Sequence, residues 1–335
     1  MRVHEALNRA LLGLLRDDPG VLVLGEDVRD PYGGAFKITA GLSSAFPGRV
    51  LGTPISEAGI VGLGTGLALA GLRPVVEIMF GDFVTLAADQ LVNQAAKFRT
   101  MYGEAASVPL VVRTPMGGRR GYGPTHSQTL EKLFFGVPGL EVVAATHVCD
   151  PGALLRATVL GTACPVLFVE NKLLYLEDVL DAEALRERHG MELTLAGAAP
   201  GTAVLAHPGR PDVTLVAYGG MTPLALEAAG TLLREEGLVC ELVVPQRICP
   251  LDPGPILTSA ARTRRVVVAE EGVGAWGWGA EVLALLAPLE LAAPAQRVGA
   301  ALEAIPARRD CEARVLPQAG DIVAAAVRTV DEDFL

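Results

Sequence analysis

The chain has 335 residues, half of them hydrophobic, and because this is more than a single core usually supports, two domains are expected. Its formal net charge of −10, without any basic stripe interleaved with aromatic residues, excludes nucleic acid as an expected partner. The five cysteines form an odd set without C-x-x-C spacing, which argues against a disulfide framework and a zinc site, so no metal site is predicted in this chain.

The N-terminal segment, residues 1–18, has charged residues inside an apolar repeat and predicts an amphipathic helix, not a secretory signal. The most apolar uncharged stretch, residues 58–72, is too short and too rich in glycine to span a membrane. We therefore expect a cytoplasmic protein with no membrane partner. The low charged fraction of 20% also suggests that other subunits cover part of the apolar surface.

Strand-length apolar runs alternate with longer periodic segments up to residue 190, which is typical of an α/β domain with a mainly parallel sheet. The predicted strands are Val21–Gly25, Pro74–Ile78, Pro109–Arg113, Glu141–Ala145 and Val166–Glu170. The predicted helices are Glu57–Ala70, Phe83–Met101, Gln128–Phe135 and Pro151–Gly161. Each strand is nearly continuous in Val, Ile and Leu, so helices should cover both faces of the sheet.

The pattern changes after Tyr175, where a charged segment precedes a stretch rich in Ala, Gly and Pro. Residues 191–210 are predicted as a linker between a first domain over 1–190 and a second over 211–335. The second domain is again predicted as α/β. Its strands are expected near Val213–Tyr218, Val239–Val244 and Arg265–Ala269, and its helices near Pro223–Glu236, Pro253–Arg262, Gly279–Leu286 and Asp321–Val330.

Glu57 is a lone carboxylate between a short extended stretch and a helix rich in glycine. Small residues allow another backbone to lie directly against such a helix. From the residues alone, two roles for Glu57 are equally supported. It either stabilises the N-terminus of the helix through the helix dipole or takes part in chemistry.

The loop RTPMGGRRGYGPTHSQ, residues 113–128, places glycines, prolines, two arginines and a histidine between a strand and a helix. Loops at this position are where α/β enzymes usually place chemistry. Thr125 and Gln128 fit a capping box, which would make His126 the first residue of the following helix. The plainer alternative is that His126 is a solvent-exposed residue on a flexible loop.

The segment EEGVGAWGWGAE, residues 270–281, matches the spacing G-x-G-x-x-G after an apolar strand and raises the alternative of a dinucleotide-binding turn. Two glutamates directly before the glycines would repel a pyrophosphate, and Trp276 crowds the turn. Too little chain follows for the rest of a nucleotide-binding half. We therefore disfavour this alternative.

Over essentially its whole length, the chain resembles the β chains of pyruvate, branched-chain 2-oxoacid and acetoin dehydrogenase complexes. The resemblance is carried by ordered blocks: LGEDV (24–28), GGAFKIT (33–39), TPISEAGIVG (53–62), GLRPVVEIMFGDF (71–83), DQLVNQAAKFR (89–99), HSQ (126–128), PGLEVVA (138–144), PVLFVENKLLY (165–175) and EEGVGAWGWGAEV (270–282). It implies a transketolase-like pyrimidine-binding domain over 1–190, followed by a transketolase C-terminal domain over 211–335.

The resemblance also implies a cofactor shared between two chains. In that family the β chain holds the aminopyrimidine of thiamine diphosphate, and the α chain holds the diphosphate and its Mg²⁺. The metal-diphosphate motif of the family begins G-D-G, whereas neither Gly81–Asp82 nor Gly320–Asp321 is followed by glycine here. We therefore expect that this chain cannot anchor the cofactor alone.

Four residues match positions with roles in the family. Glu57 matches the carboxylate that hydrogen-bonds a pyrimidine ring nitrogen and favours the imino tautomer of the cofactor. Phe83 matches an aromatic residue that stacks against the pyrimidine, and Met79 occupies a neighbouring place in the same wall. His126 matches a histidine at the mouth of the active site, expected to orient the bound intermediate and assist acyl transfer.

The activity implied is that of an α2β2 heterotetramer that decarboxylates a 2-oxoacid, or cleaves a related ketone, and passes the acyl unit to a lipoylated acyltransferase. Thr162 replaces an acidic residue that helps to bind a structural potassium ion in relatives, so that site is not transferred. Arg119 and Arg120 motivate an alternative, since arginine suits phosphate recognition. This alternative is a two-protein transketolase-like enzyme that loads a two-carbon unit onto an acyl carrier protein.

A non-enzymatic alternative is a scaffolding β-like chain that has lost catalysis. The presence of Glu57 and His126 argues against it, because a chain freed from chemistry has no need for a carboxylate at a subunit contact.

Overall fold

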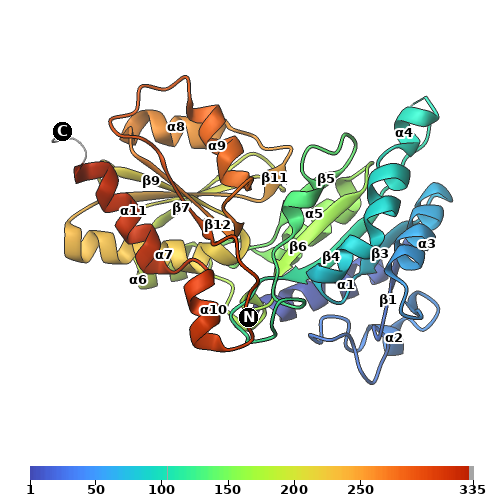
Figure 1. Ribbon diagram of the computed structural model, residues 1–335. Helices are drawn as coiled ribbons and strands as arrows, with labels where there is room; N and C mark the ends of the chain where they lie inside the picture. The colour runs from blue at the N-terminus through green and yellow to red at the C-terminus, as the bar shows by residue number, and fades with distance from the viewer. Residues whose placement is uncertain (104, 332–335) are drawn as a thin grey trace.

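The computed structural model describes residues 1–103 and 105–331, so the last four residues of the predicted second domain lie outside the described part. Two α/β halves lie side by side, blue to green and yellow to red in Figure 1. The first sheet has seven strands in the order β11-β5-β6-β4-β3-β1-β2, and the second has six in the order β13-β12-β9-β10-β8-β7. The predicted fold class is confirmed.

The first sheet is parallel except at one edge, where β11 pairs antiparallel with β5. Its strands are β1 (Val21–Gly25), β2 (Val50–Gly52), β3 (Arg73–Glu77), β4 (Val111–Met116), β5 (Glu141–Ala144), β6 (Val166–Asn171) and β11 (Arg247–Cys249). Every residue of β4 and β6 is buried. The continuous apolar runs therefore mark strands covered on both faces, as expected.

Helices cover the two faces of the first sheet with separate cores. On one face lie α1 (Val3–Asp17) and α5 (Pro151–Gly161), and the short helix α2 (Leu42–Ala45) lies near the β2 edge. On the other face lie α3 (Glu57–Leu69), the 3₁₀ helix η1 (Gly81–Ala87), the π-helix η2 (Gln90–Ala95) and α4 (Phe98–Met101). None of the helices in the described part of the chain is long and apolar enough to cross a bilayer.

The second sheet is parallel over β13, β12, β9 and β10, and ends in an antiparallel hairpin. Its strands are β7 (Glu192–Ala196), β8 (Thr202–Ala206), β9 (Val213–Ala217), β10 (Cys240–Pro245), β12 (Val266–Val273) and β13 (Gln296–Ala300). Its helices are α6 (Ala182–His189), α7 (Thr222–Thr231), α8 (Gly254–Thr263), α9 (Trp278–Leu286), α10 (Arg309–Val315) and α11 (Ala319–Asp331). Shorter helical turns are η3 (Glu131–Phe134), η4 (Leu174–Leu176), η5 (Gly219–Met221) and η6 (Leu232–Glu236).

One hydrophobic core joins the two halves. It contains α3 and η1 residues of the first half together with α8, α9 and β12 residues of the second, including Ile256, Val268 and Trp278. The strand β11 strengthens this connection, because it comes from the second half of the sequence and pairs with β5 of the first sheet. The halves are therefore interdependent.

Four predicted segments differ from the structure, and one of them is the predicted helix Pro223–Glu236, which is divided into α7 and η6. The predicted linker, residues 191–210, forms the hairpin β7–β8, and its outer strand is largely exposed, so it needs little apolar sequence. The predicted helix Phe83–Met101 is divided into η1, η2 and α4. The predicted helix Gln128–Phe135 is reduced to the single turn η3, Glu131–Phe134.

Candidate active site

The predicted site residues gather at one edge of the first sheet. The strands β1, β3, β4 and β6 are mutually parallel neighbours, so their carboxyl ends meet at the same edge. Glu26 follows β1, Met79 and Phe80 follow β3, residues 117–130 follow β4, and Lys172 follows β6. Ligand sites of α/β proteins lie at this edge.

Glu57 is the first residue of α3, as predicted, and its side chain is buried with only 6% exposure. Its carboxylate has no hydrogen-bond partner among the described residues. Buried polar groups normally have a partner, because desolvation without one is costly. The carboxylate of Glu57 is therefore available to a donor that the described residues do not supply.

A second carboxylate, Glu26, shares this part of the site and was not predicted. Burial and the nearby charge of Glu57 raise the pKa of Glu26. One oxygen of Glu26 is buried without a partner in the described residues. Its position directly after the first strand, within LGEDV, was the signal that the sequence offered.

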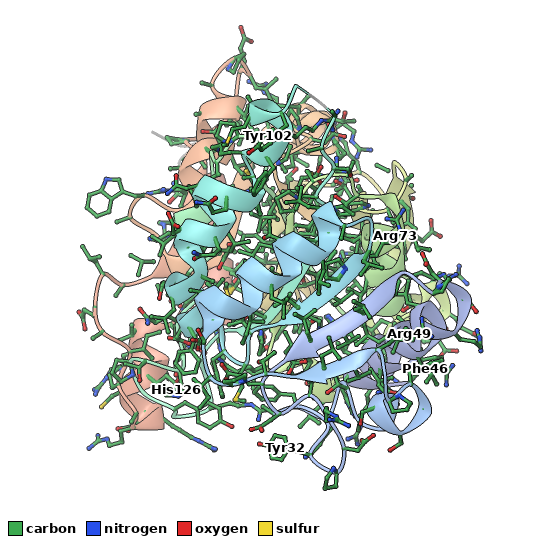
Figure 2. The ribbon with its side chains drawn as sticks, turned by 90° about the vertical axis from the view of Figure 1, so that its right-hand side faces the viewer. Tyr32, Phe46, Arg49, Arg73, Tyr102 and His126 are labelled. Carbon is green, nitrogen blue, oxygen red and sulfur yellow. The ribbon has the colours of Figure 1, made fainter. Side chains whose placement is uncertain are left out.

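An aromatic wall surrounds His126. Its imidazole meets the rings of Phe80 and Phe83 edge to face, with centroids 4.9 and 5.2 Å away and interplanar angles of 78° and 83°. Tyr122 also contacts Phe80, at 6.2 Å. Figure 2 shows His126 at the end of the first half opposite to Tyr102. Phe83 and His126, both predicted site residues, thus contact each other, and Phe80, which contacts both, was not predicted.

Met79 is half-buried and directly precedes Phe80, at the exit of β3. This position is consistent with the prediction that Met79 lies beside an aromatic residue in one wall of the site. Packing of α3 against β3 and η1 brings the helix that begins at Glu57 to the same region. The four predicted residues, Glu57, Met79, Phe83 and His126, therefore lie on neighbouring elements of the first half.

The predicted helix at His126 is wrong. Residues 124–126 form a turn, and the hydroxyl of Thr125 lies 3.0 Å from the Nδ1 atom of His126. Gln128 does not complete a capping box; its backbone N–H and its side-chain amide donate to Asp82 at 3.2 and 2.9 Å. Because Asp82 satisfies these donors from η1, the segment needs no helix to do so.

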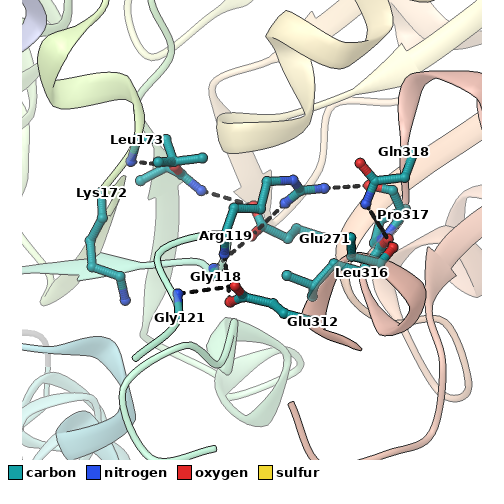
Figure 3. A network of polar contacts seen from close by, with 12 residues as sticks. Gly118, Arg119, Gly121, Lys172, Leu173, Glu271, Glu312, Leu316, Pro317 and Gln318 are labelled. Atoms are coloured by element: carbon teal, nitrogen blue, oxygen red, sulfur yellow. Dashed lines mark hydrogen bonds and ion pairs between the residues drawn. The ribbon is translucent and has the colours of Figure 1, made fainter. Parts of the chain in front are cut away.

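Arg119 is anchored within the chain (Figure 3). Its guanidinium lies 2.9 Å from the Glu271 carboxylate and also donates to the carbonyl of Pro317, while its backbone N–H donates to Glu312 at 2.7 Å. Arg120 is half-buried and donates to the carbonyl of Lys172 at 3.2 Å. Two of the three guanidinium nitrogens of Arg119 are thus engaged within the chain, which weakens the transketolase-like alternative.

The second half holds the loop that contains Arg119 through backbone amides. Glu271 accepts the N–H of Gly118 at 2.8 Å, and Glu312 accepts the N–H of Gly121 at 3.0 Å. Gly117 has φ +94°, and an added Cβ there would lie 2.4 Å from Asn171, so glycine is required. We call residues 117–123 the mouth loop.

The G-x-G-x-x-G segment is occupied by the protein itself. Glu270 accepts the N–H groups of Trp278 and Gly279 at the start of α9, at 2.8 and 2.9 Å. A dinucleotide would need those same amides for its pyrophosphate. An added Cβ at Gly277 would lie 2.3 Å from Glu270, so the glycine accommodates this carboxylate. Because Glu270 already accepts these amides, the structure disfavours the dinucleotide-binding alternative.

Beneath the site, Arg113 of β4 bridges two neighbouring strands. It donates to Glu170 of β6 at 2.9 and 2.6 Å and also pairs with Glu77 of β3. Tyr175 donates to the same Glu170 carboxylate at 2.6 Å. Arg113 and Glu170 are each only 1% exposed. This network fixes the spacing of the strands that carry the site.

Thr162 follows α5, and its hydroxyl donates to the carbonyl oxygen of Cys164 at 2.6 Å. The Cys164 backbone N–H donates back to the hydroxyl of Thr162 at 3.1 Å. This segment therefore stabilises itself through local hydrogen bonds.

Comparison with known proteins agrees with this geometry. The family model described as "Transketolase, pyrimidine binding domain" matches residues 1–177, and "Transketolase, C-terminal domain" matches residues 201–322. The chain is 39% identical to pyruvate dehydrogenase E1 component subunit beta-1, mitochondrial, of Oryza sativa subsp. japonica, over 98% of this chain and 86% of the relative. It is 35% identical to acetoin:2,6-dichlorophenolindophenol oxidoreductase subunit beta of Bacillus subtilis (strain 168), over 99% and 98%.

The chain belongs to the family of these dehydrogenase β subunits. Membership confirms the predicted resemblance and the prediction of an oxidoreductase β subunit. Among solved structures, "Split gene transketolase, inactive beta4 tetramer" has a TM-score of 0.78 at 23% identity and covers 99% of both chains. A transketolase from Leishmania mexicana has a TM-score of 0.67 at 16% identity, covering 98% of this chain and 45% of that one. These two structures show the fold.

Proposed function

We propose that this chain supplies the pyrimidine-binding half of the active site in a thiamine-diphosphate-dependent 2-oxoacid dehydrogenase. A partner α chain would hold the diphosphate and its Mg²⁺ in an α2β2 heterotetramer. The single observation that carries the proposal is Glu57, a buried carboxylate at the start of α3 that makes no hydrogen bond within the described chain. The names of the relatives as E1 β subunits support it.

The residues present fit an aminopyrimidine. Glu57 offers a carboxylate that would accept a hydrogen bond from a protonated ring nitrogen, and Phe83 and Met79 offer apolar surface for the ring. When bound, thiamine diphosphate supplies the carbanion that attacks the carbonyl carbon of the 2-oxoacid. The part of Glu57 is to hold a proton at the ring nitrogen, which controls the basicity of the amino group.

His126 is suited to orient the substrate at the mouth and to move a proton during acyl transfer. Thr125 engages its Nδ1 atom, and no residue of the described chain engages Nε2. The edge-to-face contacts with Phe80 and Phe83 restrict rotation of the ring. Nε2 is therefore the atom presented to the substrate.

We propose a lipoylated acyltransferase as the acceptor of the acyl unit, in a cytoplasmic complex. The alternative acceptor, an acyl carrier protein, was motivated by the arginine pair. Arg119 is used in contacts with Glu271, Glu312 and Pro317. The arginine pair therefore supports an acyl carrier protein less strongly in the structure than it did in the sequence.

The test is Glu57→Gln in the enzyme reconstituted with its α chain. Because a neutral amide cannot hold the ring proton as a carboxylate does, kcat should fall by about 100-fold or more. Oxidative decarboxylation of pyruvate and branched-chain 2-oxoacids, and oxidative cleavage of acetoin, would be measured with an artificial electron acceptor. The matched control is Glu183→Gln, an exposed residue on α6, which should retain full activity.

Full activity of Glu57→Gln would disprove the role of this carboxylate. Calorimetry supplies an independent check of the shared site. Thiamine diphosphate with Mg²⁺ should bind the α2β2 complex and not this chain alone. Tight binding to the isolated chain would contradict the proposed division between α and β.

A further inference from the structure

Lys172 is a buried cation directly after β6, between the sheet and the mouth of the candidate site. Its side chain is fully buried, with 0% exposure. Its backbone N–H donates to the carbonyl of Met116 at the end of β4, at 3.1 Å. Both ends of the residue are thus fixed, since its backbone N–H is bonded to the end of β4 and its side chain is enclosed.

The ammonium group of Lys172 reaches across to the histidine segment. Its Nζ atom donates to the backbone carbonyl of His126 at 2.8 Å. The same atom lies 5.3 Å from the centroid of the Phe80 ring, which also contacts the His126 imidazole. Lys172 therefore contacts both the backbone that carries the imidazole and one wall of the space in which it lies.

Burial of a lysine is costly, and surrounding charges only partly offset the cost. The groups that face it from neighbouring elements are Asp82 of η1, Glu271 of β12, Glu312 of α10 and Arg120 of the mouth loop. The three carboxylates favour the ammonium form, and Arg120 opposes it. The chain thus surrounds a cation at this point with acidic groups from both halves.

We infer that Lys172 is a positioning residue whose ammonium group holds the backbone of His126 so that the imidazole faces the active-site mouth. This inference rests on the proposed function of His126. A turn held by few backbone bonds has alternatives of similar energy, and a charge-assisted hydrogen bond selects one of them. Asp82 fixes the other side of the same turn through Gln128.

The protonation of Lys172 supports this assignment. Burial lowers its pKa to about 8. Below that pH the ammonium group donates to the carbonyl of His126. Above it, the neutral amine is a weaker donor, so the turn loosens as pH rises. The kcat for acyl transfer should therefore fall as pH rises through about 8, because Lys172 loses its proton. We call this fall the alkaline limb.

The experiment compares Lys172→Met and Lys172→Arg in the reconstituted α2β2 enzyme. Methionine keeps the length of the side chain and removes the donor, so kcat for acyl transfer to a free lipoyl domain should fall about tenfold or more. The KM for the 2-oxoacid should change less than kcat. Arginine keeps a charge at all accessible pH values. Lys172→Arg should therefore recover part of kcat and move the alkaline limb above pH 8.

The matched control is Lys132→Met. Lys132 also donates to backbone carbonyls, those of Val273 and Ala275, both at 3.1 Å, but outside the site. The Lys132→Met variant should leave kcat and the alkaline limb unchanged. If Lys172→Met keeps wild-type kcat and an alkaline limb near pH 8, the inference is wrong. It is also wrong if Lys172→Arg leaves that limb in place.

A second readout separates this inference from the proposed function. The titration of His126, one of five histidines, would be followed by NMR of the ¹³C-labelled full chain. Lys172→Met should shift and broaden the His126 signal, whereas Lys132→Met should not. If the reconstituted enzyme has no dehydrogenase activity, the proposed function fails, but NMR still measures the effect of Lys172 on His126. An unchanged His126 signal in Lys172→Met would overturn the inference in either case.

Discussion

Glu131 is a carboxyl group enclosed between the two halves, with 1% exposure. Tyr218 of the second half donates to one of its oxygens, and the other oxygen has no partner among the described residues. Burial raises its pKa to about 7, the hydrogen bond from Tyr218 opposes the rise, and the charges of Glu270 and Glu271 add to it. Glu131 therefore stays protonated in the folded chain over a pH range where it would ionise after unfolding.

Replacing Glu131 by Gln should change how stability depends on pH. Because its pKa is raised in the folded state, its contribution is fully present below about pH 4.5 and is lost as pH rises through about 7. The loss is on the order of 1.4 kcal/mol per pH unit. Denaturant unfolding measures this effect: between pH 5 and pH 8, the free energy of unfolding should fall less for Glu131→Gln than for the wild type. An equal fall in both proteins would contradict the raised pKa of Glu131.

Single residues were predictable where their neighbours in sequence explained them. Glu57 stood out because it is a lone charge before a glycine-rich helix; it begins α3 as predicted, and it is buried there. Lys172 and Glu26 did not stand out, since each is an ordinary polar residue just after an apolar strand. Only the parallel pairing of β1, β3, β4 and β6 shows that these residues share one edge.

At the scale of elements, the strands β3, β4 and β6 are joined by side chains as well as by backbone. Arg113 connects the carboxylates of Glu77 and Glu170, and burial raises the pKa of Glu77 while the charge of Arg113 opposes the rise. The three side chains satisfy one another inside the sheet. Removal of the cation would leave two buried carboxylates without their partner.

Arg113→Met should therefore destabilise the chain by about 3–5 kcal/mol, the range typical of a broken buried ion pair. Chemical denaturation monitored by circular dichroism measures the change. Arg308→Met is the matched control, because Arg308 pairs with Asp310 where both side chains are exposed, 75% and 61%. That variant should lose far less stability than Arg113→Met, because solvent screens an exposed ion pair. Equal losses in both variants would contradict the importance of burial.

Elements with long apolar or periodic runs were predicted well, including β1 and α5, whose bounds match the prediction. Elements stabilised by distant partners were not. The turn at His126 depends on Asp82 and Lys172, which are remote in sequence. The hairpin β7–β8 depends on pairing with β10, and nothing within 191–210 reveals that partner.

At the scale of the whole molecule, the second half shapes the first half's mouth loop. Glu312 lies on α10, which Figure 1 places below the second sheet and beside the N-terminal half. It accepts two backbone N–H groups of the mouth loop, from Arg119 and Gly121. Glu312 is 1% exposed, so these bonds are shielded from water.

Glu312→Ala should release the mouth loop, because it leaves both amides without an acceptor. Hydrogen exchange followed by mass spectrometry should show about tenfold faster exchange in peptides covering 117–123, since one lost bond of this kind costs roughly 1.4 kcal/mol or more. Glu303→Ala, an exposed residue before the same helix, serves as the control and should leave exchange unchanged. Unaltered protection in Glu312→Ala would show that other contacts hold the loop.

The strand β11 limits how such chains can be divided or recombined. It lies beyond residue 240 in sequence yet completes the first sheet by covering the edge of β5. A fragment that ends near residue 190 would expose that edge, which is a template for unwanted pairing between molecules. Exchange of C-terminal modules between related genes would therefore also transplant an outer strand into a foreign sheet. Recombination points that respect the folded protein must keep β5 and β11 from the same parent.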